Sequence, residues 1–219
     1  MEAWVGMLEK RGWEVPREEM KWGTTGGDEK DQEVRIGGEK IERVKRKEGF
    51  KALGNIVSFD GHVDETLKMR IAKAWGIFWA YKHLLVCKLA KWKDKLRVLK
   101  TTVEKSLLWG SGSWHVTVNQ CSRLRGVQRK MIGIMAREEL RKMKEHKPNE
   151  PKYFYFPRRA NHINWIMERF EVQSWDVTVK RNVFNFAGHV SRMGQYDSDR
   201  LVHQALQWKN RKWLKTVEE

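Results

Sequence analysis

Three acidic residues that lie close together in the sequence are the first candidates for chemistry. They are Asp60, Asp64 and Glu65. Transfer of a nucleotide needs two or more carboxylates that converge on Mg²⁺, which bridges the attacking and the leaving oxygen. The chain has no adjacent pair of aspartates and no glycine-rich phosphate-binding motif. We therefore interpret Asp60 as part of a turn and the other two as the start of a helix. We predict no catalytic residue, no metal-binding residue and no cofactor in this chain.

Histidines and cysteines offer the second kind of candidate. His115 and His189 have no second metal-type ligand at helical spacing, so we interpret both as packed or hydrogen-bonded side chains. Cys87 and Cys121 are the only cysteines, too few for a disulfide scaffold, and neither belongs to a zinc-binding motif. Both fit the role of a small buried apolar residue in a reducing compartment. No nucleophile, base and orienting group come together locally.

The basic residues carry the strongest signal. The 219 residues include 44 Lys plus Arg and 28 Asp plus Glu, a formal net charge of +16. Residues 1–49 hold 11 basic and 12 acidic side chains, so the whole excess follows residue 49. Such a charge argues against an enzyme for small neutral metabolites and favours a polyanion, either nucleic acid or an anionic membrane. Twelve Trp supply material for a core.

The elements that position these residues change in type along the chain. Residues 2–11 read as a short helix with Ala3, Met7 and Leu8 on its apolar face. Two alternating runs over 34–44, around a Gly-Gly pair, predict a β-hairpin. Residues 50–58 predict a third strand, which a turn at Asp60-Gly61 ends.

From Asp64 onward the apolar spacing is helical. We predict helices near 64–85, 91–108 and 119–144, a proline-interrupted linker over 146–157, and helices near 158–171, 175–193 and 199–209. The expected inward residues are Leu67, Ile71, Ala74, Trp75, Phe78, Leu96, Leu99, Val103, Leu107, Leu124, Val127, Met131, Ile134, Met135, Ile163, Ile166, Phe170, Val179, Val183, Phe186, Val190, Leu201, Ala205 and Trp208. The predicted fold is mainly α, with a small N-terminal β-hairpin or three-strand element followed by a basic helical bundle.

Seven segments of the chain together resemble the C-terminal part of reverse transcriptases from non-long-terminal-repeat (non-LTR) retrotransposons, the LINE-like elements. They keep the family's order over about residues 50 to 195. The segments are Phe50-Lys51-Ala52-Leu53-Gly54, Ser58-Phe59-Asp60-Gly61, Arg70-Ile71-Ala72-Lys73-Ala74, Lys100-Thr101-Thr102-Val103, Ser106-Leu107-Leu108-Trp109-Gly110-Ser111, Leu124-Arg125-Gly126-Val127-Gln128-Arg129-Lys130-Met131 and Phe186-Ala187-Gly188-His189-Val190-Ser191-Arg192-Met193. Trp75, Trp109 and Trp114 fall within or beside these segments, so we expect them in the helical core.

The resemblance implies a domain plan. Residues 1–58 resemble the palm edge with its primer-grip strand, 59–145 the thumb, 146–157 a linker and 158–219 a C-terminal helical region. The family's catalytic Tyr-x-Asp-Asp turn would precede residue 1, and with it the carboxylates that hold Mg²⁺ in the intact enzyme. The chain alone would then bind primer–template nucleic acid without polymerase activity. Its partners would be RNA or DNA and the missing palm and fingers.

The resemblance also suggests which residues touch nucleic acid. Phe50, Lys51, Leu53 and Gly54 resemble the primer grip, which holds the 3′ end of the growing strand. On the thumb-like helices, phosphate contacts are expected from Lys68, Arg70, Lys73 and Lys82. A denser cluster follows in the helix over 119–144, which contains eight basic and two acidic residues. There we expect phosphate contacts from Arg123, Arg125, Arg129 and Lys130.

Two other functions stay open at this point. The chain could be a free-standing basic module that binds nucleic acid or another partner and reuses thumb helices. A basic amphipathic protein on acidic membranes is the weakest alternative, and no run of about 18 apolar residues predicts a membrane-spanning helix. We expect an intracellular protein in the cytoplasm, the nucleus or both.

Overall fold

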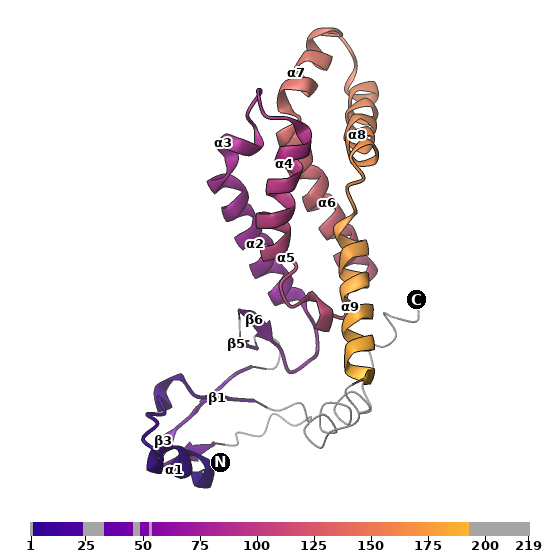
Figure 1. Cartoon of the computed structure of the whole chain (residues 1–219). Coiled ribbons are helices and arrows are strands. Elements are labelled where there is room, and N and C mark those ends of the chain that lie inside the picture. The colour runs from indigo at the N-terminus through magenta and orange to yellow at the C-terminus, as the bar shows by residue number, and fades with distance from the viewer. Residues whose placement is uncertain (1, 24–32, 46–48, 53, 193–219) are drawn as a thin grey trace. The chain divides into compact units, whose positions relative to one another are not determined.

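The computed structural model describes residues 2–23, 33–45, 49–52 and 54–192 (Figure 1). The chain divides into two compact units, Met1–Thr66 and Leu67–Glu219. The described residues are mainly helical with a few short strands near the N-terminus, which confirms the predicted fold class. The boundary between the units lies after Thr66 rather than after residue 58.

The N-terminal unit contains α1 (Glu2–Lys10), the 3₁₀ turn η1 (Arg17–Glu19) and three two-stranded pairings. Strands β2 (Arg35–Ile36) and β3 (Glu39–Lys40) are antiparallel, as the Gly-Gly pair predicts. Gly37 and Gly38 have φ of 60° and 85°, the backbone that a tight hairpin turn requires. Strand β4 (Glu42–Arg43) pairs in parallel with β1 (Lys21–Trp22).

Tertiary contacts correct two predictions in this unit. In α1 Val5 is buried and packs with Ile36 and Ile41, whereas Ala3 and Met7 of the predicted face are exposed. A short helix buries whichever side meets the hairpin, and one turn of apolar spacing does not determine that side. The single strand predicted over 50–58 is a hairpin of β5 (Phe50–Ala52) and β6 (Asn55–Val57).

In the C-terminal unit, α2 (Asp64–Ala80) and α3 (Lys82–Leu85) cover the predicted helix 64–85. The predicted helix 91–108 is continuous but changes type along its length. It consists of α4 (Trp92–Val98), the π-helical segment η2 (Leu99–Glu104) and α5 (Lys105–Leu107). Its predicted stripe is confirmed at Leu99, Val103 and Leu107, which are buried.

A sharp turn separates these helices from the rest of the unit. Gly110 has a φ of 73° and leads into the 3₁₀ turn η3 (Ser111–Ser113). An added Cβ at Gly112 would lie 2.9 Å from the Phe186 Cβ, so the small residue permits the close approach of the last helix. Asn182 on that helix donates a 2.8 Å hydrogen bond to the Ser111 hydroxyl.

The remaining helices are α6 (Val118–Met135), α7 (Arg137–Glu145), α8 (Lys152–Arg169) and α9 (Trp175–Arg192). Helix α6 packs against both α8 and α9 (Figure 1). The fully buried side chains of the unit include Phe78, Leu67, Leu85, Leu107, Leu124, Met131, Ile132, Ile166, Val179 and Trp175. Burial is confirmed for the predicted inward residues Leu67, Ile71, Ala74, Phe78, Leu99, Val103, Leu107, Leu124, Met131, Met135, Ile163, Ile166, Val179, Val183 and Val190.

Several expectations in this unit need correction. The predicted linker 146–157 is helical from Lys152, and Pro157 lies inside α8. Arg158 next to it donates a 3.1 Å hydrogen bond to the Met143 carbonyl, which fixes the start of α8 against α7. Phe186 and Trp109 are exposed rather than inward, whereas Trp114 is buried. The predicted helix 199–209, with Leu201, Ala205 and Trp208, lies outside the described residues.

Candidate nucleic-acid interface

Helix α6 is the most strongly basic element of the C-terminal unit. Its 18 residues include Arg123, Arg125, Arg129 and Lys130 and no acidic residue. A capping box starts it: the Thr117 hydroxyl accepts from the Gln120 N–H at 3.3 Å, and the Gln120 side chain accepts from the Thr117 N–H at 2.8 Å. By contrast, Arg141 in α7 pairs with Glu138 and Glu145, so α7 has less uncompensated charge.

The four cations of α6 form two separate faces. At about 100° of rotation per residue, Arg123 and Lys130 lie within roughly 20° of each other around the axis. Arg125 and Arg129 lie roughly 40° apart and more than about 100° away from the first pair. The structure therefore divides the predicted cluster, and no single surface contains all four side chains.

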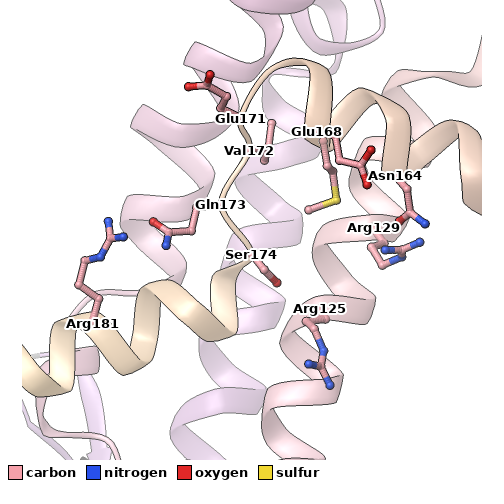
Figure 2. A pocket seen from close by; sticks show the side chains of 10 residues that line it. Arg125, Arg129, Asn164, Glu168, Glu171, Val172, Gln173, Ser174 and Arg181 are labelled. Carbon is pink, nitrogen blue, oxygen red and sulfur yellow. The ribbon is translucent and has the colours of Figure 1, made fainter.

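The Arg125 and Arg129 face borders the turn between α8 and α9 (Figure 2). An open pocket of about 680 Å³ lies there, lined by Arg125, Arg129, Asn164, Met167, Glu168, Glu171, Val172, Gln173, Ser174 and Arg181. The Arg125 Nη1 atom lies 3.2 Å from the Asp176 carboxylate, and the Arg129 Nη2 atom donates to the Ala160 carbonyl at 3.5 Å. Both guanidinium groups thus hold the helices together, and two glutamates offset part of the pocket's charge.

One buried polar side chain fixes this turn to α6. Gln128 on α6 is fully buried. Its Nε2 donates to the Gln173 carbonyl at 2.9 Å, and its Oε1 accepts from the Trp175 N–H at 3.0 Å. It therefore satisfies a carbonyl before α9 and one of the first N–H groups of α9, neither of which has a partner within the helix.

The turn also contains a strained residue. Glu171 has a φ of 52° and is the one described non-glycine residue with positive φ. Its N–H donates to the Glu168 carbonyl and the Val172 N–H donates to the Met167 carbonyl, the hydrogen bonds of a Schellman motif. Glycine usually occupies this position, because a Cβ is unfavourable in the left-handed region.

On α2, three of the relevant residues share one stripe. Lys68, Trp75 and Trp79 are separated by seven and four residues, which places them within roughly 40° of one another around the axis, and Lys82 follows as the first residue of α3. The Trp75 and Trp79 rings stack with centroids 6.0 Å apart and planes at 24°. The Lys82 Nζ atom lies 5.5 Å from the Trp79 ring centroid.

The Arg123 and Lys130 face of α6 joins this stripe. The Lys130 Nζ atom lies 5.8 Å from the Trp75 ring centroid, so a cation from α6 and the aromatic pair of α2 are neighbours. We name the set of Lys130, Trp75, Trp79 and Lys82 the Trp–Lys ladder. Its two lysines are exposed, Trp79 is 48% exposed and Trp75 is half-buried. The fully buried Phe78 contacts both tryptophan rings edge-on and anchors them.

Two of the other predicted phosphate contacts lie elsewhere. Arg70 is only 3% exposed, and its guanidinium donates to the Ser106 carbonyl at 3.2 Å, so it braces the helices instead of facing a ligand. Lys73 is exposed but lies roughly 150° around α2 from the ladder. Arg123, two turns from Lys130 on the same side of α6, is exposed.

The primer-grip-like residues belong to the N-terminal unit. Phe50 is half-buried, with its ring centroid 5.8 Å from that of Phe59. Lys51 is exposed, and Gly54 has a φ of 80° at the turn between β5 and β6. Leu53 lies outside the described residues. Within the N-terminal unit, the Thr66 hydroxyl donates to the Ile56 carbonyl at 2.6 Å.

The acidic candidates take local roles. An Asp60 carboxylate oxygen accepts from the His62 N–H at 2.9 Å, and Asp64 and Glu65 lie in the first turn of α2. Among the described residues, no three His, Cys, Asp or Glu side chains come together as a metal site. Sequence reasoning missed one pair in Asp-x-Asp spacing, Asp197 and Asp199, which falls outside the described residues.

Two further titratable groups are structural. Glu104 accepts a 3.0 Å hydrogen bond from the indole N–H of the buried Trp175, and burial raises the pKa of its carboxyl group. Burial also raises the pKa of the Cys121 thiol, which fits its predicted role as a small core residue. His115 is half-buried and His189 is exposed.

No protein-family model, curated protein or solved structure matches this chain. Of the helices in the described part of the chain, none has an apolar stretch long enough to cross a membrane.

Proposed function

We propose that this chain binds the phosphate backbone of RNA or DNA through one exposed surface. That surface is formed by cations at neighbouring positions of α2, the start of α3 and α6. The single observation that carries the proposal is the composition and placement of α6. It has four cations and no acid, and its Lys130 lies against Trp75 in the stripe of Lys68, Trp75 and Trp79 on α2, which Lys82 of α3 follows. A surface of this kind fits a polyanion better than a small ligand.

Phosphate contacts by lysine and arginine release counterions from the nucleic acid. They supply affinity and position but carry no sequence information. We therefore propose binding that is independent of sequence and weakens steeply with salt. The expected contacts are Lys68, Lys82, Arg123 and Lys130, whereas Arg125 and Arg129 mainly hold α8 and α9 in place.

We propose further that the chain is the thumb part of a LINE-like reverse transcriptase. This rests on the ordered segments between residues 50 and 195. In that role the chain would hold primer–template nucleic acid in the cytoplasm or nucleus, and would need the palm and fingers, with their Mg²⁺, for nucleotide transfer. Primer extension by the purified chain with Mg²⁺ and template would contradict this part of the proposal.

The proposed binding surface is tested by equilibrium binding to an RNA–DNA hybrid duplex at one fixed salt concentration. The variant R123Q/K130Q removes two cations from the surface. Two exposed ion pairs at about 0.2–1 kcal/mol each correspond to roughly 2- to 30-fold weaker binding. The control K10Q/R11Q removes two exposed cations from the N-terminal unit and should leave the affinity unchanged. Equal losses in both variants would place binding elsewhere.

A second candidate is a free-standing nucleic-acid-binding module built from thumb helices. It is favoured by the compact C-terminal unit, which has its own core. Reading the genomic sequence upstream of Met1 for an in-frame Tyr-x-Asp-Asp distinguishes the two: its presence favours the polymerase fragment, and its absence favours the module.

A further inference from the structure

Trp79 borders an open site at the end of α2. Trp75 precedes Trp79 by one helical turn and stacks on it. A shallow pocket of about 450 Å³ is lined by Trp79, Lys82, His83, Val86 and Cys87. Trp75 is not among the lining residues, and all of the others follow Trp79 in the chain.

The residues around this site suit a planar, polar ring. Trp79 is a large aromatic surface that is 48% exposed and held from behind by Trp75 and Phe78. The Lys82 ammonium lies over the ring, 5.5 Å from its centroid, on a flexible stem that can move to a phosphate. The exposed His83 adds an imidazole that can donate or accept a hydrogen bond at the edge of the pocket.

We propose that the Trp–Lys ladder binds single-stranded RNA or DNA, with an unpaired base stacked on the open side of Trp79 and the flanking phosphates on Lys82 and Lys130. This inference rests on the proposed function and narrows its ligand. Every nucleobase has an aromatic face, so stacking on tryptophan tolerates any sequence. Single-strand binding surfaces combine aromatic rings that stack on bases with cations that follow the backbone.

The ladder distinguishes single strands from duplexes for a geometric reason. In a duplex the bases are paired and stacked on one another, so an exposed surface ring can reach only phosphates and sugars. The cations serve both kinds of ligand, whereas Trp79 contributes fully only when a base is free. Removal of the Trp79 ring should therefore weaken single-strand binding selectively.

The test uses the full chain, a mixed-sequence single-stranded oligonucleotide and the hybrid duplex formed from the same strand. Stacking on one aromatic side chain is worth about 1–3 kcal/mol per base, so W79A should bind the single strand roughly 5- to 150-fold more weakly. Duplex affinity should change less than about twofold. W79F keeps an aromatic ring and should retain most of the affinity.

Trp165 on α8 gives a matched control. It is 53% exposed and stacks on His162 with centroids 5.8 Å apart, and it is not part of the ladder. W165A should bind both ligands as the unchanged chain does. Thermal unfolding followed by circular dichroism shows whether each variant is folded. If W79A does not fold, the binding of W79F is compared with that of the unchanged chain instead.

An oligonucleotide with abasic sites tests the contact from the side of the ligand. It keeps the phosphates and removes the bases, so its affinity for the unchanged chain should fall by the factor seen in W79A. The W79A substitution and the abasic sites remove the same contact. The affinity of W79A for the abasic oligonucleotide should therefore be little lower than the affinity measured with either change alone.

The outcomes separate the inference from the proposed function. If W79A weakens single-strand and duplex binding equally, the stacking inference is wrong. It is also wrong if W79A weakens neither kind of binding while the binding of both ligands stays salt-dependent. If neither oligonucleotide binds the unchanged chain, the proposed function fails and the inference fails with it.

Discussion

The buried side chain of Gln128 offers the sharpest test of how the helices around the interface are held. We propose the substitution Gln128→Met, which keeps the length and volume of the side chain and removes both of its hydrogen bonds. The change leaves the buried Trp175 N–H without its acceptor at 3.0 Å and the Gln173 carbonyl without its donor at 2.9 Å.

The expected loss follows from these two bonds. An unsatisfied buried donor costs about 1–3 kcal/mol, and loss of a typical hydrogen bond to the partly buried carbonyl adds about 1 kcal/mol. The free energy of unfolding of the C-terminal unit should therefore fall by roughly 2–4 kcal/mol. Because methionine fits the same volume, a cavity contributes little to this loss.

Urea denaturation followed by tryptophan fluorescence measures the effect, since Trp175 is fully buried in the folded unit. Gln173→Met is the matched control: Gln173 is half-buried, and its backbone carbonyl, not its side chain, takes part in the contact. The control should lose less than about 1 kcal/mol. If Q128M and the unchanged chain unfold at the same urea concentration, the bond pair does not hold the turn and this reasoning is refuted.

Three further predictions concern stability. Glu171→Gly should raise the free energy of unfolding by about 0.5–1 kcal/mol in urea denaturation, because it relieves a φ of 52°; a loss would mean that the glutamate side chain stabilises the turn. Thr117→Ala should lose about 1 kcal/mol in thermal unfolding, whereas Thr117→Ser should keep most of the cap; equal melting of all three chains would contradict the capping role. Burial raises the pKa of Glu104 above the ordinary 4.5, so the folded chain binds this proton more tightly than the unfolded chain does, and ionised Glu104 reduces stability at neutral pH. Glu104→Gln should be more stable than the unchanged chain at neutral pH, and the difference should narrow as the pH falls towards 4.5; a difference that stays constant with pH would contradict this origin.

The sequence predicted those elements whose conformation depends on neighbouring residues in the chain. The pair Gly37 and Gly38 determines a hairpin because a tight turn needs positive φ at both positions. Leu99, Val103 and Leu107 are buried as their spacing indicates, even though the helix changes to π geometry between them. In these places sequence and tertiary structure favour the same conformation.

Other elements depend on contacts that the sequence does not display. The prolines near residue 150 predict a linker, yet Arg158 anchors α8 to α7 and the helix starts at Lys152. Val5 is buried because Ile36 and Ile41 pack on it. A hairpin replaces the strand predicted over 50–58, since alternation alone does not indicate where a chain reverses.

The candidate interface was predicted in its residue types but not in its arrangement. Counting basic residues groups Arg70 with Lys73 and Lys82, although Arg70 is buried against the Ser106 carbonyl. The stripe of Lys68, Trp75 and Trp79 has helical spacing that the sequence alone could have shown. Its neighbour Lys130 on α6 required the structure, because helix packing brings that cation to the Trp75 ring.

The central claim is that the exposed cations of α2, α3 and α6 bind nucleic-acid phosphates. The salt dependence of binding tests this claim most directly. For the hybrid duplex, the logarithm of the association constant should fall linearly with the logarithm of salt concentration, with a slope of about −0.9 per phosphate contacted. R123Q/K130Q should reduce the magnitude of this slope by roughly 1.8, and K10Q/R11Q should leave it unchanged. A flat salt response of the unchanged chain, or identical slopes in all three proteins, would contradict the claim.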